Sequence, residues 1–528
     1  MALPAASPWS PLRQKTFRWL WLASVASNIG TWMHEVGAGW LMTSLSASPM
    51  NVALVQVAGS LPMFFLALPA GALADIVDKR RYLLGVQLWM AAVAALLAVL
   101  TLLGLTTVWL LLALTLCMGI GTALMMPAWS ATTPELVGKD ELAAAVALSS
   151  VGINLARAVG PAIAGMLVSL VGPWLTFALN AASFFAVIGV LAAWKRETSP
   201  AVLPAERLFG ALRAGWRYSR SSRPLQAVLV RAFSFFLGAS AGMSLLPLIV
   251  RGEMHGSATD FGLLLGSVGV GAVVGAALLP RLRERLGSDR LVVLSSALYA
   301  LVLVALALLR QLYVLVPVML LSGAAWIAVL SSLQVAAQTS VPGWVRARAL
   351  AVYILVFFGS MAGGGVLWGL VASRTSIPVA LLGASVLLLL GLPAALRFRL
   401  PVTAAEDLAP SLHWPAPILA EGMDRERGPV MVTLEYDIEP AQAPDFQAAM
   451  AHVHGMRRRN GAISWYLVQD SENPRQWLEC FVDESWLEHL RHHQRVTRGE
   501  LRIEAAARQY QTSGVEIRIR HYLQGAAH

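Results

Sequence analysis

Charged residues are scarce in this sequence, and their scarcity sets the class of protein. Asp, Glu, Lys and Arg make up 13% of the 528 residues, whereas a soluble globular domain carries about 25%. Hydrophobic residues reach 57%, and the mean hydropathy is +0.63. This composition excludes an ordinary soluble enzyme and indicates a protein that lies within a membrane.

Three further features that the sequence lacks exclude particular kinds of membrane protein. Cysteine occurs twice, at Cys117 within an apolar run and at Cys480 in a polar tail, so we expect no disulfide framework. No Gly-x-x-x-x-Gly-Lys-Ser/Thr loop is present, which argues against transport driven by ATP bound to this chain. No small-residue cleavage site follows the first apolar run, so we expect a retained helix there rather than a signal peptide.

Long apolar runs are what the sequence has in abundance. Each can supply the roughly 20 helical residues that cross a hydrocarbon core of about 30 Å. Twelve spans are predicted, at 17–42, 51–74, 82–103, 107–127, 143–170, 174–194, 226–250, 259–279, 290–309, 312–336, 347–372 and 377–396. The predicted fold is an all-α membrane protein of twelve transmembrane helices, followed by a small soluble domain.

The basic residues of the connecting loops predict the topology. When the loops are assigned to alternate sides, only Arg251, Arg310 and Arg374 fall outside, and the other loop cations fall inside. Cytoplasmic loops carry the excess of Lys and Arg. We therefore expect a multi-pass protein of the bacterial inner membrane with both termini in the cytoplasm. The net charge of +10 then reflects topology and implies no nucleic-acid partner.

An internal repeat relates the two halves of the apolar region. A shift of 204 residues, without a gap, pairs Gly71 with Gly275, Gly119 with Gly323, Val137 with Val341, Gly160 with Gly364 and Gly165 with Gly369. The pairing predicts two parallel repeats of six helices. Transporters built in this way hold their substrate near the midplane between two rocking halves.

The predicted domains are a first bundle at 1–194, a cytoplasmic loop at 195–225, a second bundle at 226–400, a Pro-rich linker at 401–428 and an α+β domain at 429–528.

The short loop GALADIVDKRR concentrates charge between two apolar runs. Gly71 would let a neighbouring backbone approach closely, and Asp75 lies one helical turn later at the membrane edge. With Arg80 and Arg81, this carboxylate could form a gating latch that breaks when the halves rock. An ordinary solvated turn is the alternative.

This loop resembles the loop signature of the major facilitator superfamily, Gly-x-Leu-x-Asp followed by a basic cluster. The matching residues are Gly71, Leu73, Asp75, Arg80 and Arg81. Ile76 stands where an arginine is usual, and Leu279 replaces the aspartate in the second half, so only one half could form the full latch.

The fifth span carries a second resemblance. Gly160, Pro161 and Gly165 resemble the Gly-Pro-x-x-Gly-Gly element of facilitator antiporters, which implies export. Plain helix packing by small residues is the alternative. Across 12–400 the chain is similar to the facilitator branch that includes the enterobactin exporter.

Four ionisable residues fall within the predicted spans, where a charge costs several kcal/mol: His34, Glu35, Arg157 and Arg231. Glu35 lies about 25 Å, and Arg157 about 21 Å, from the inner ends of their helices, so their depths are similar. We expect a pair in which protonation of Glu35 frees Arg157 for an anionic or catecholate-like substrate; a static stabilising pair is the alternative. Arg231 is expected to extend toward the interface.

Three polar residues accompany this pair as candidates for substrate binding or coupling. Asn28 shares a helix face with Glu35, and Asn154 shares one with Arg157. His34 is either a coupling group or a residue that reaches the outer interface.

The tail reads as alternating strands and helices. Strands are predicted at 430–438, 462–470, 477–482 and 515–523, and helices at 443–458, 485–494 and 499–510. This order suggests a ferredoxin-like domain, similar to the antibiotic-biosynthesis-monooxygenase group. His489 and His493, spaced i, i+4, are weak candidates for metal ligands, since no carboxylate or cysteine stands nearby at a suitable spacing. We expect no metal or cofactor, and pairing of this domain in a homodimer rather than catalysis.

The predicted function is secondary active transport of the facilitator type. The chain would export a small molecule (a siderophore, drug or metabolite) across the lipid bilayer by alternating access, coupled to protons. A facilitator-type importer is one alternative. A membrane-anchored enzyme that uses the C-terminal domain is the other.

Overall fold

The computed structural model describes residues 9–194, 218–400, 405–411, 413–414 and 427–524. The described chain separates into two units. The first comprises most of the long helices, and the second consists mainly of the C-terminal domain. The predicted loop at 195–225 and linker at 401–428 fall largely outside the described residues.

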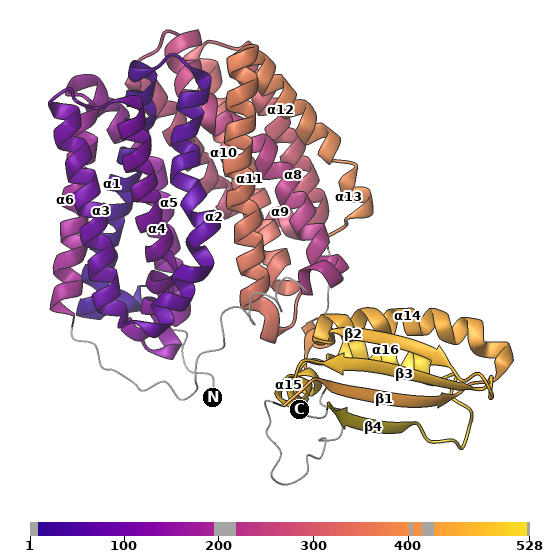
Figure 1. The fold of residues 1–528 in the computed structure, drawn as a ribbon. Coiled ribbons are helices and arrows are strands. Elements are labelled where there is room, and N and C mark those ends of the chain that lie inside the picture. The colour runs from indigo at the N-terminus through magenta and orange to yellow at the C-terminus, as the bar shows by residue number, and fades with distance from the viewer. Residues whose placement is uncertain (1–8, 195–217, 401–404, 412, 415–426, 525–528) are drawn as a thin grey trace. The chain divides into compact units, whose positions relative to one another are not determined.

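Long helices follow the predicted apolar spans (Figure 1). The first bundle contains α1 (Lys15–Leu45), α2 (Pro49–Ile76), α3 (Lys79–Leu102), α4 (Val108–Leu136), α5 (Leu142–Leu170) and α6 (Pro173–Ala193). The second contains α8 (Arg223–Leu248), α9 (Ala258–Leu308), α10 (Leu312–Thr339), α11 (Arg346–Arg374), α12 (Ile377–Gly391) and the short α13 (Ala394–Arg397).

Helix α9 is too long to be a single membrane span. Its 51 residues would extend about 76 Å at 1.5 Å per residue, more than twice a hydrocarbon core. Gly287 breaks the helix, because its φ of 74° is not helical and is open to glycine at no steric cost. Among the described residues, ten helices are long and apolar enough to cross a membrane, with α9 counted once and α1 not included. The number twelve stays a prediction.

The internal repeat reappears in the packing of the helices. A Cβ at Gly160 of α5 would lie 2.7 Å from the Cβ of Trp32 on α1. The paired Gly364 of α11 would place a Cβ 2.6 Å from the carbonyl oxygen of Leu237 on α8. Glycine is needed at both positions because the fifth and first helices of each half approach so closely.

The C-terminal domain has the predicted ferredoxin-like topology. Its strands are β1 (Val430–Asp437), β2 (Ser464–Gln469), β3 (Gln476–Asp483) and β4 (Arg518–Leu523), in the order β2-β3-β1-β4 and all antiparallel. Its helices are α14 (Ala443–Asn460), α15 (Trp486–Arg495) and α16 (Arg498–Arg508). Figure 1 shows α14 and α16 over one face of the sheet. Alternate residues of β1 and β3 fill the core on that face.

A buried ion cluster crosses this core. Arg457 of α14 is 1% exposed, and it donates to Glu479 of β3 at 2.9 Å and to Glu504 of α16 at 2.7 Å. Burial opposes the charge of Arg457, but the two carboxylates outweigh that effect and hold its pKa above the ordinary value. Burial also raises the pKa of Glu504, but Arg457, His413 and Trp414 more than reverse this and lower it to about 2.

We expect Arg457→Ala to destabilise the C-terminal domain by about 3–5 kcal/mol, because two buried carboxylates lose their cation. Protease susceptibility of this domain in the full chain measures the effect, and the exposed Arg498→Ala is the matched control. Because the pKa of Glu504 is depressed, its contribution is present above pH 4.5 and is lost as the pH falls toward 2. Equal protease resistance of the two variants would contradict this account.

Candidate functional site

The two bundles touch where α1 ends and α2 begins, which we call the α1–α2 end. Thr259 of α9 places its Oγ1 2.9 Å from the Oγ of Ser169 on α5. The backbone N–H of Met50 on α2 donates to the Oγ of Ser373 on α11 at 3.0 Å. These hydrogen bonds join helices of different halves.

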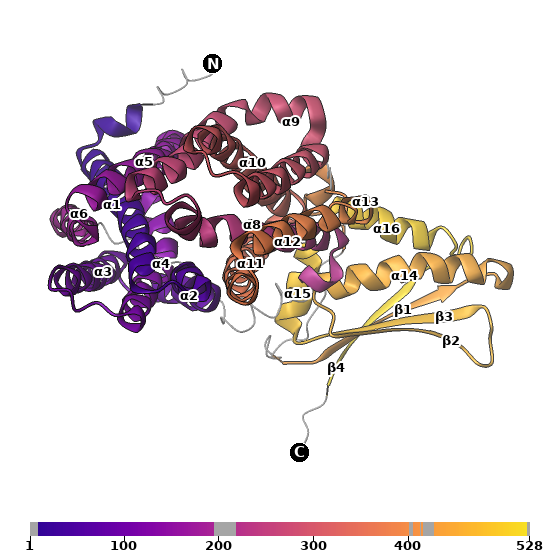
Figure 2. The ribbon, with the colours of Figure 1, turned by 90° about the horizontal axis from the view of Figure 1, so that it is seen from above.

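Two repeat-related glycines make these contacts possible. A Cβ at Gly165 of α5 would lie 2.5 Å from the carbonyl oxygen of Ala258 on α9. A Cβ at Gly369 of α11 would lie 2.8 Å from the Cβ of Ala53 on α2. Any larger residue would push the helices apart. Figure 2 shows α5 beside α9 and α2 beside α11, so the two contacts are equivalent under the repeat.

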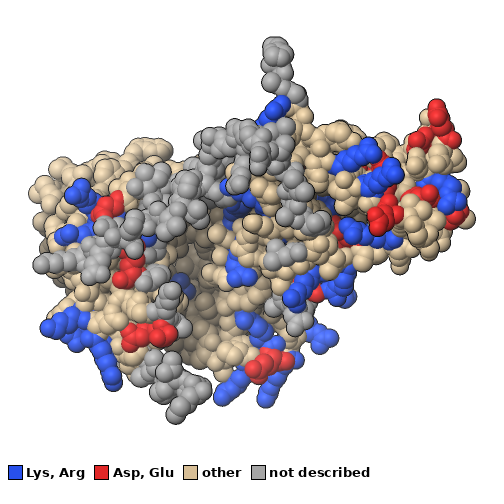
Figure 3. All heavy atoms as spheres, turned by 90° about the horizontal axis from the view of Figure 1, so that it is seen from below, with Lys and Arg blue, Asp and Glu red and all other residues tan. Residues whose placement is uncertain are grey.

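The opposite end, where α2 ends and α3 begins, is open. We call it the α2–α3 end. Figure 3 looks onto it and shows the surface hollowed between the bundles, with Lys and Arg around the hollow. Among the described residues, a Cβ at Gly71 would meet nothing within 4 Å, and the close backbone approach expected at Gly71 stays a prediction.

Glu35 and Arg157 lie together deep in the first bundle. An electrostatic interaction links them, although no ion pair within 4.0 Å joins them among the described residues. Glu35 is exposed. The guanidinium of Arg157 lies 5.5 Å from the ring centroid of Trp32, and its Nε is buried without a hydrogen-bond partner among the described residues. Glu35 and Arg157 therefore stay candidates for ligand binding and coupling.

The other predicted polar residues occupy different surroundings. Asn28 lines an open pocket between α1, α4 and α5, toward the α2–α3 end. Asn154 donates to the carbonyl oxygen of Ser150 in its own helix at 2.9 Å. His34 is buried against Phe177 of α6, with ring centroids 4.8 Å apart, and neither ring nitrogen has a hydrogen-bond partner among the described residues. It thus points away from Glu35.

The charged loop after α2 makes contacts within the first bundle. Arg80 donates through its Nε to the carbonyl oxygen of Leu191 at 2.8 Å, at the end of α6. Lys79 pairs with Glu135 of α4 at 2.8 Å. The side chain of Asp75 is not described, so the latch between Asp75, Arg80 and Arg81 stays a prediction.

Arg231 has a charged partner within the protein. It is 6% exposed and forms an ion pair with Asp289, which lies 58 residues away in the chain and follows the break in α9. Its extension toward the membrane interface stays a prediction.

The two weak metal candidates of the tail lie side by side. The Nε2 atoms of His489 and His493, both on α15, are 3.2 Å apart. The Nδ1 of His489 contacts the Oδ2 of Asp483 at 2.9 Å. Burial, with the neighbouring imidazoles, lowers the pKa of His493 to about 3 and that of His521 to about 4.

A match to known sequences decides the family. The family described as transmembrane secretion effector, of the major facilitator superfamily, matches residues 6–528. The chain belongs to this family of transporters. This confirms the predicted membership of the major facilitator superfamily.

Relatives of this facilitator include siderophore transporters. The staphyloferrin A transporter of Staphylococcus aureus is 24% identical over 277 residues, which are 52% of this chain and 69% of that protein. The enterobactin exporter EntS of Escherichia coli is 29% identical over 290 residues, which are 53% and 68% of the two chains. A solved structure of the nucleoside transporter NupG shares the fold, with a TM-score of 0.61 at 15% identity, over 73% of this chain and 100% of that one.

Sequence reasoning missed several residues of these sites. Ser169 and Thr259 carry no signal that distinguishes them from other helix hydroxyls. A signal for His521 was present in the strand pattern. His521 stands two residues from both Ile519 and Leu523, and residues two apart on a strand face the same side of the sheet.

Proposed function

We propose that this facilitator exports a small anionic molecule of the siderophore class across the inner membrane, by alternating access and coupled to protons. The observation that carries the proposal is that hydrogen bonds and close glycine contacts join the bundles at the α1–α2 end, whereas the surface between them is hollowed at the α2–α3 end. An electrostatic interaction links Glu35 of α1 with Arg157 of α5, and we assign these two charges to the wall of the chamber. Such a chamber opens to one side at a time.

The direction and topology rest on the loop cations. Lys79, Arg80 and Arg81 lie at the α2–α3 end, and Lys and Arg are enriched in cytoplasmic loops. The open end is then cytoplasmic, both termini lie inside, and the structure represents a conformation that accepts substrate from the cytoplasm. Export, rather than import, also agrees with the antiporter-like Gly160, Pro161 and Gly165.

The chemistry of the chamber favours an anionic, aromatic substrate. A guanidinium binds carboxylate and catecholate oxygens, and Trp32 beside it offers a ring for stacking. Enterobactin and staphyloferrin A, named for the relatives, are the first probes to use. A drug or another metabolite is the alternative within export.

Proton coupling follows from the neighbourhood of the two charges. While Glu35 is ionised, its charge compensates Arg157. Protonation of Glu35 from the outward side removes that compensation. The affinity of Arg157 for an anion then changes with the protonation state of Glu35. A static pair that only stabilises the bundle is the alternative.

A disulfide across the closed end tests alternating access. In a background with Cys117→Ala and Cys480→Ser, we expect oxidised Ser169→Cys/Thr259→Cys to stop export of enterobactin from cells, because the native oxygens are only 2.9 Å apart. Reduction should restore export, and each single-cysteine variant should remain active. Full export by the completely oxidised pair would overturn the mechanism.

Coupling is tested by Glu35→Gln in proteoliposomes with an imposed pH gradient. Transport by this variant should fall to the rate seen without a gradient, while exchange of substrate at equal pH continues. Glu253→Gln is the matched control, because Glu253 pairs with Arg310 at 3.1 Å near the α1–α2 end, away from the chamber. A wild-type response to the gradient would remove Glu35 from the mechanism. Vesicles of known orientation distinguish export from import.

For the C-terminal domain we propose pairing with a second copy rather than catalysis. The sheet face opposite α14 and α16 exposes Met431, Tyr466, Val468 and Tyr522, an apolar surface suited to a like surface.

Pairing predicts a dimer for the purified full chain and a monomer for Tyr466→Asp, by light scattering in detergent. His452→Ala, on the exposed side of α14, should leave the mass unchanged. A monomeric wild-type protein would contradict the proposed pairing. Turnover of a substrate by the domain would favour the enzyme alternative.

A further inference from the structure

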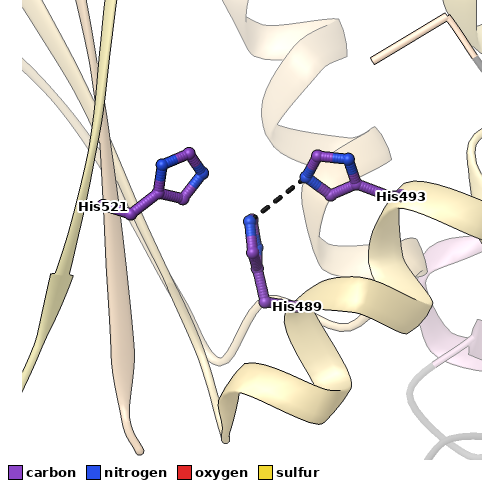
Figure 4. A group of neighbouring side chains, drawn as sticks. All are labelled: His489, His493 and His521. Carbon is purple, nitrogen blue, oxygen red and sulfur yellow. Dashed lines mark hydrogen bonds between the residues drawn. The ribbon is translucent and has the colours of Figure 1, made fainter. Parts of the chain in front are cut away.

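Three histidines from two separate elements converge in the C-terminal domain. Figure 4 shows His489 and His493 of α15 and His521 of β4 with their rings turned toward one another. One nitrogen from each lies within 4.8 Å of the other two. The sequence separates His521 from His489 by 32 residues, and β4 and α15 bring them together only in the fold.

The nitrogen spacing suits a tetrahedral ion. Zinc–nitrogen bonds of about 2.05 Å place two ligand nitrogens about 3.3 Å apart. The Nε2 atoms of His489 and His493 are already 3.2 Å apart. The third ring needs to close by at most about 1.5 Å from its 4.8 Å limit. Such a shift costs little, because β4 is an edge strand that pairs with β1 alone.

An outer layer of contacts orients the central ligand. Asp483, at the end of β3, is 1% exposed and accepts from the Nδ1 of His489 at 2.9 Å. This contact fixes the proton on Nδ1 and leaves the lone pair of Nε2 facing His493. A carboxylate behind a histidine ligand is the arrangement that raises ligand basicity and holds the ring in zinc sites.

Aromatic rings limit access to the cluster. Trp414 packs edge-on against His493, with centroids 4.7 Å apart, and Trp486 lies 5.6 Å from His489 and 5.8 Å from His521. His521, on the edge strand β4, stays accessible to solvent, so an ion can reach the three nitrogens.

We propose that His489, His493 and His521 form a binding site for a divalent transition-metal ion of the zinc type, with the fourth position open to water or to an anionic ligand. Imidazole nitrogen selects Zn²⁺, Co²⁺, Ni²⁺ and Cu²⁺ over Mg²⁺ and Ca²⁺, which prefer oxygen ligands. The site belongs to the C-terminal domain and does not depend on what the membrane helices transport.

The test measures metal binding by the full chain, purified in detergent with an affinity tag that contains no histidine and stripped with a chelator. We expect one Zn²⁺ per chain by titration calorimetry, and visible d–d absorption of tetrahedral Co²⁺. His493→Ala and His521→Ala should each weaken Zn²⁺ binding at least about tenfold, as losses within a zinc site do. His452→Ala, an exposed histidine on α14, should bind as the wild type does.

A second variant separates ligation from folding. His521→Cys should restore Zn²⁺ binding and add a thiolate–Co²⁺ charge-transfer band, because a cysteine sulfur can replace an imidazole in such a site. Absence of stoichiometric Zn²⁺ binding in the wild type would overturn the proposal, as would equal binding by His521→Ala and His452→Ala. In either case the three rings would be packing residues only. Transport assays with enterobactin are unaffected by that outcome, so the two proposals fail separately.

Discussion

The contact of α5 with α9 and of α11 with α2, through Gly165 and Gly369, is the constraint on which the membrane unit depends. It brings backbone against backbone at one end of the two bundles, where no side chain could fit. Lipid tails are as apolar as the helices, so close packing and hydrogen bonds must hold the halves together. Because the repeat supplies both contacts, the closed end is held symmetrically and the other end is free to open.

Closing one end creates a place for charges inside the membrane. A guanidinium facing lipid would be expensive, but Arg157 has Trp32 over it and Glu35 in its field. Each of these three residues comes from α1 or α5, the two helices that Gly160 allows to approach. The small residues of the fifth helix therefore do two things: they close the end of the chamber, and they position its charges.

The C-terminal domain also has charged residues in its interior. Its core contains the ions Arg457, Glu479 and Glu504, and beside them a group of histidines held by Asp483. Buried ions stabilise a fold only when each is paired, and here each carboxylate is shared among several donors. This density of directed polar contacts holds α14, α15 and α16 in register with the sheet, so that β4 meets α15 at the histidines.

Sequence alone determined the membrane class, the approximate positions of the long helices, the repeat and the βαββαβ order of the tail, because these depend on hydrophobic length, on periodicity and on loop composition near each element. It also placed Glu35 and Arg157 at one depth, since rise per residue is constant along a helix. Only the tertiary structure decided which end is closed, that His34 turns to α6, that Arg231 pairs with Asp289, and that His521 completes a cluster with His489 and His493. Those outcomes depend on which helix faces which, and contacts between residues far apart in the chain are set by packing rather than by local pattern.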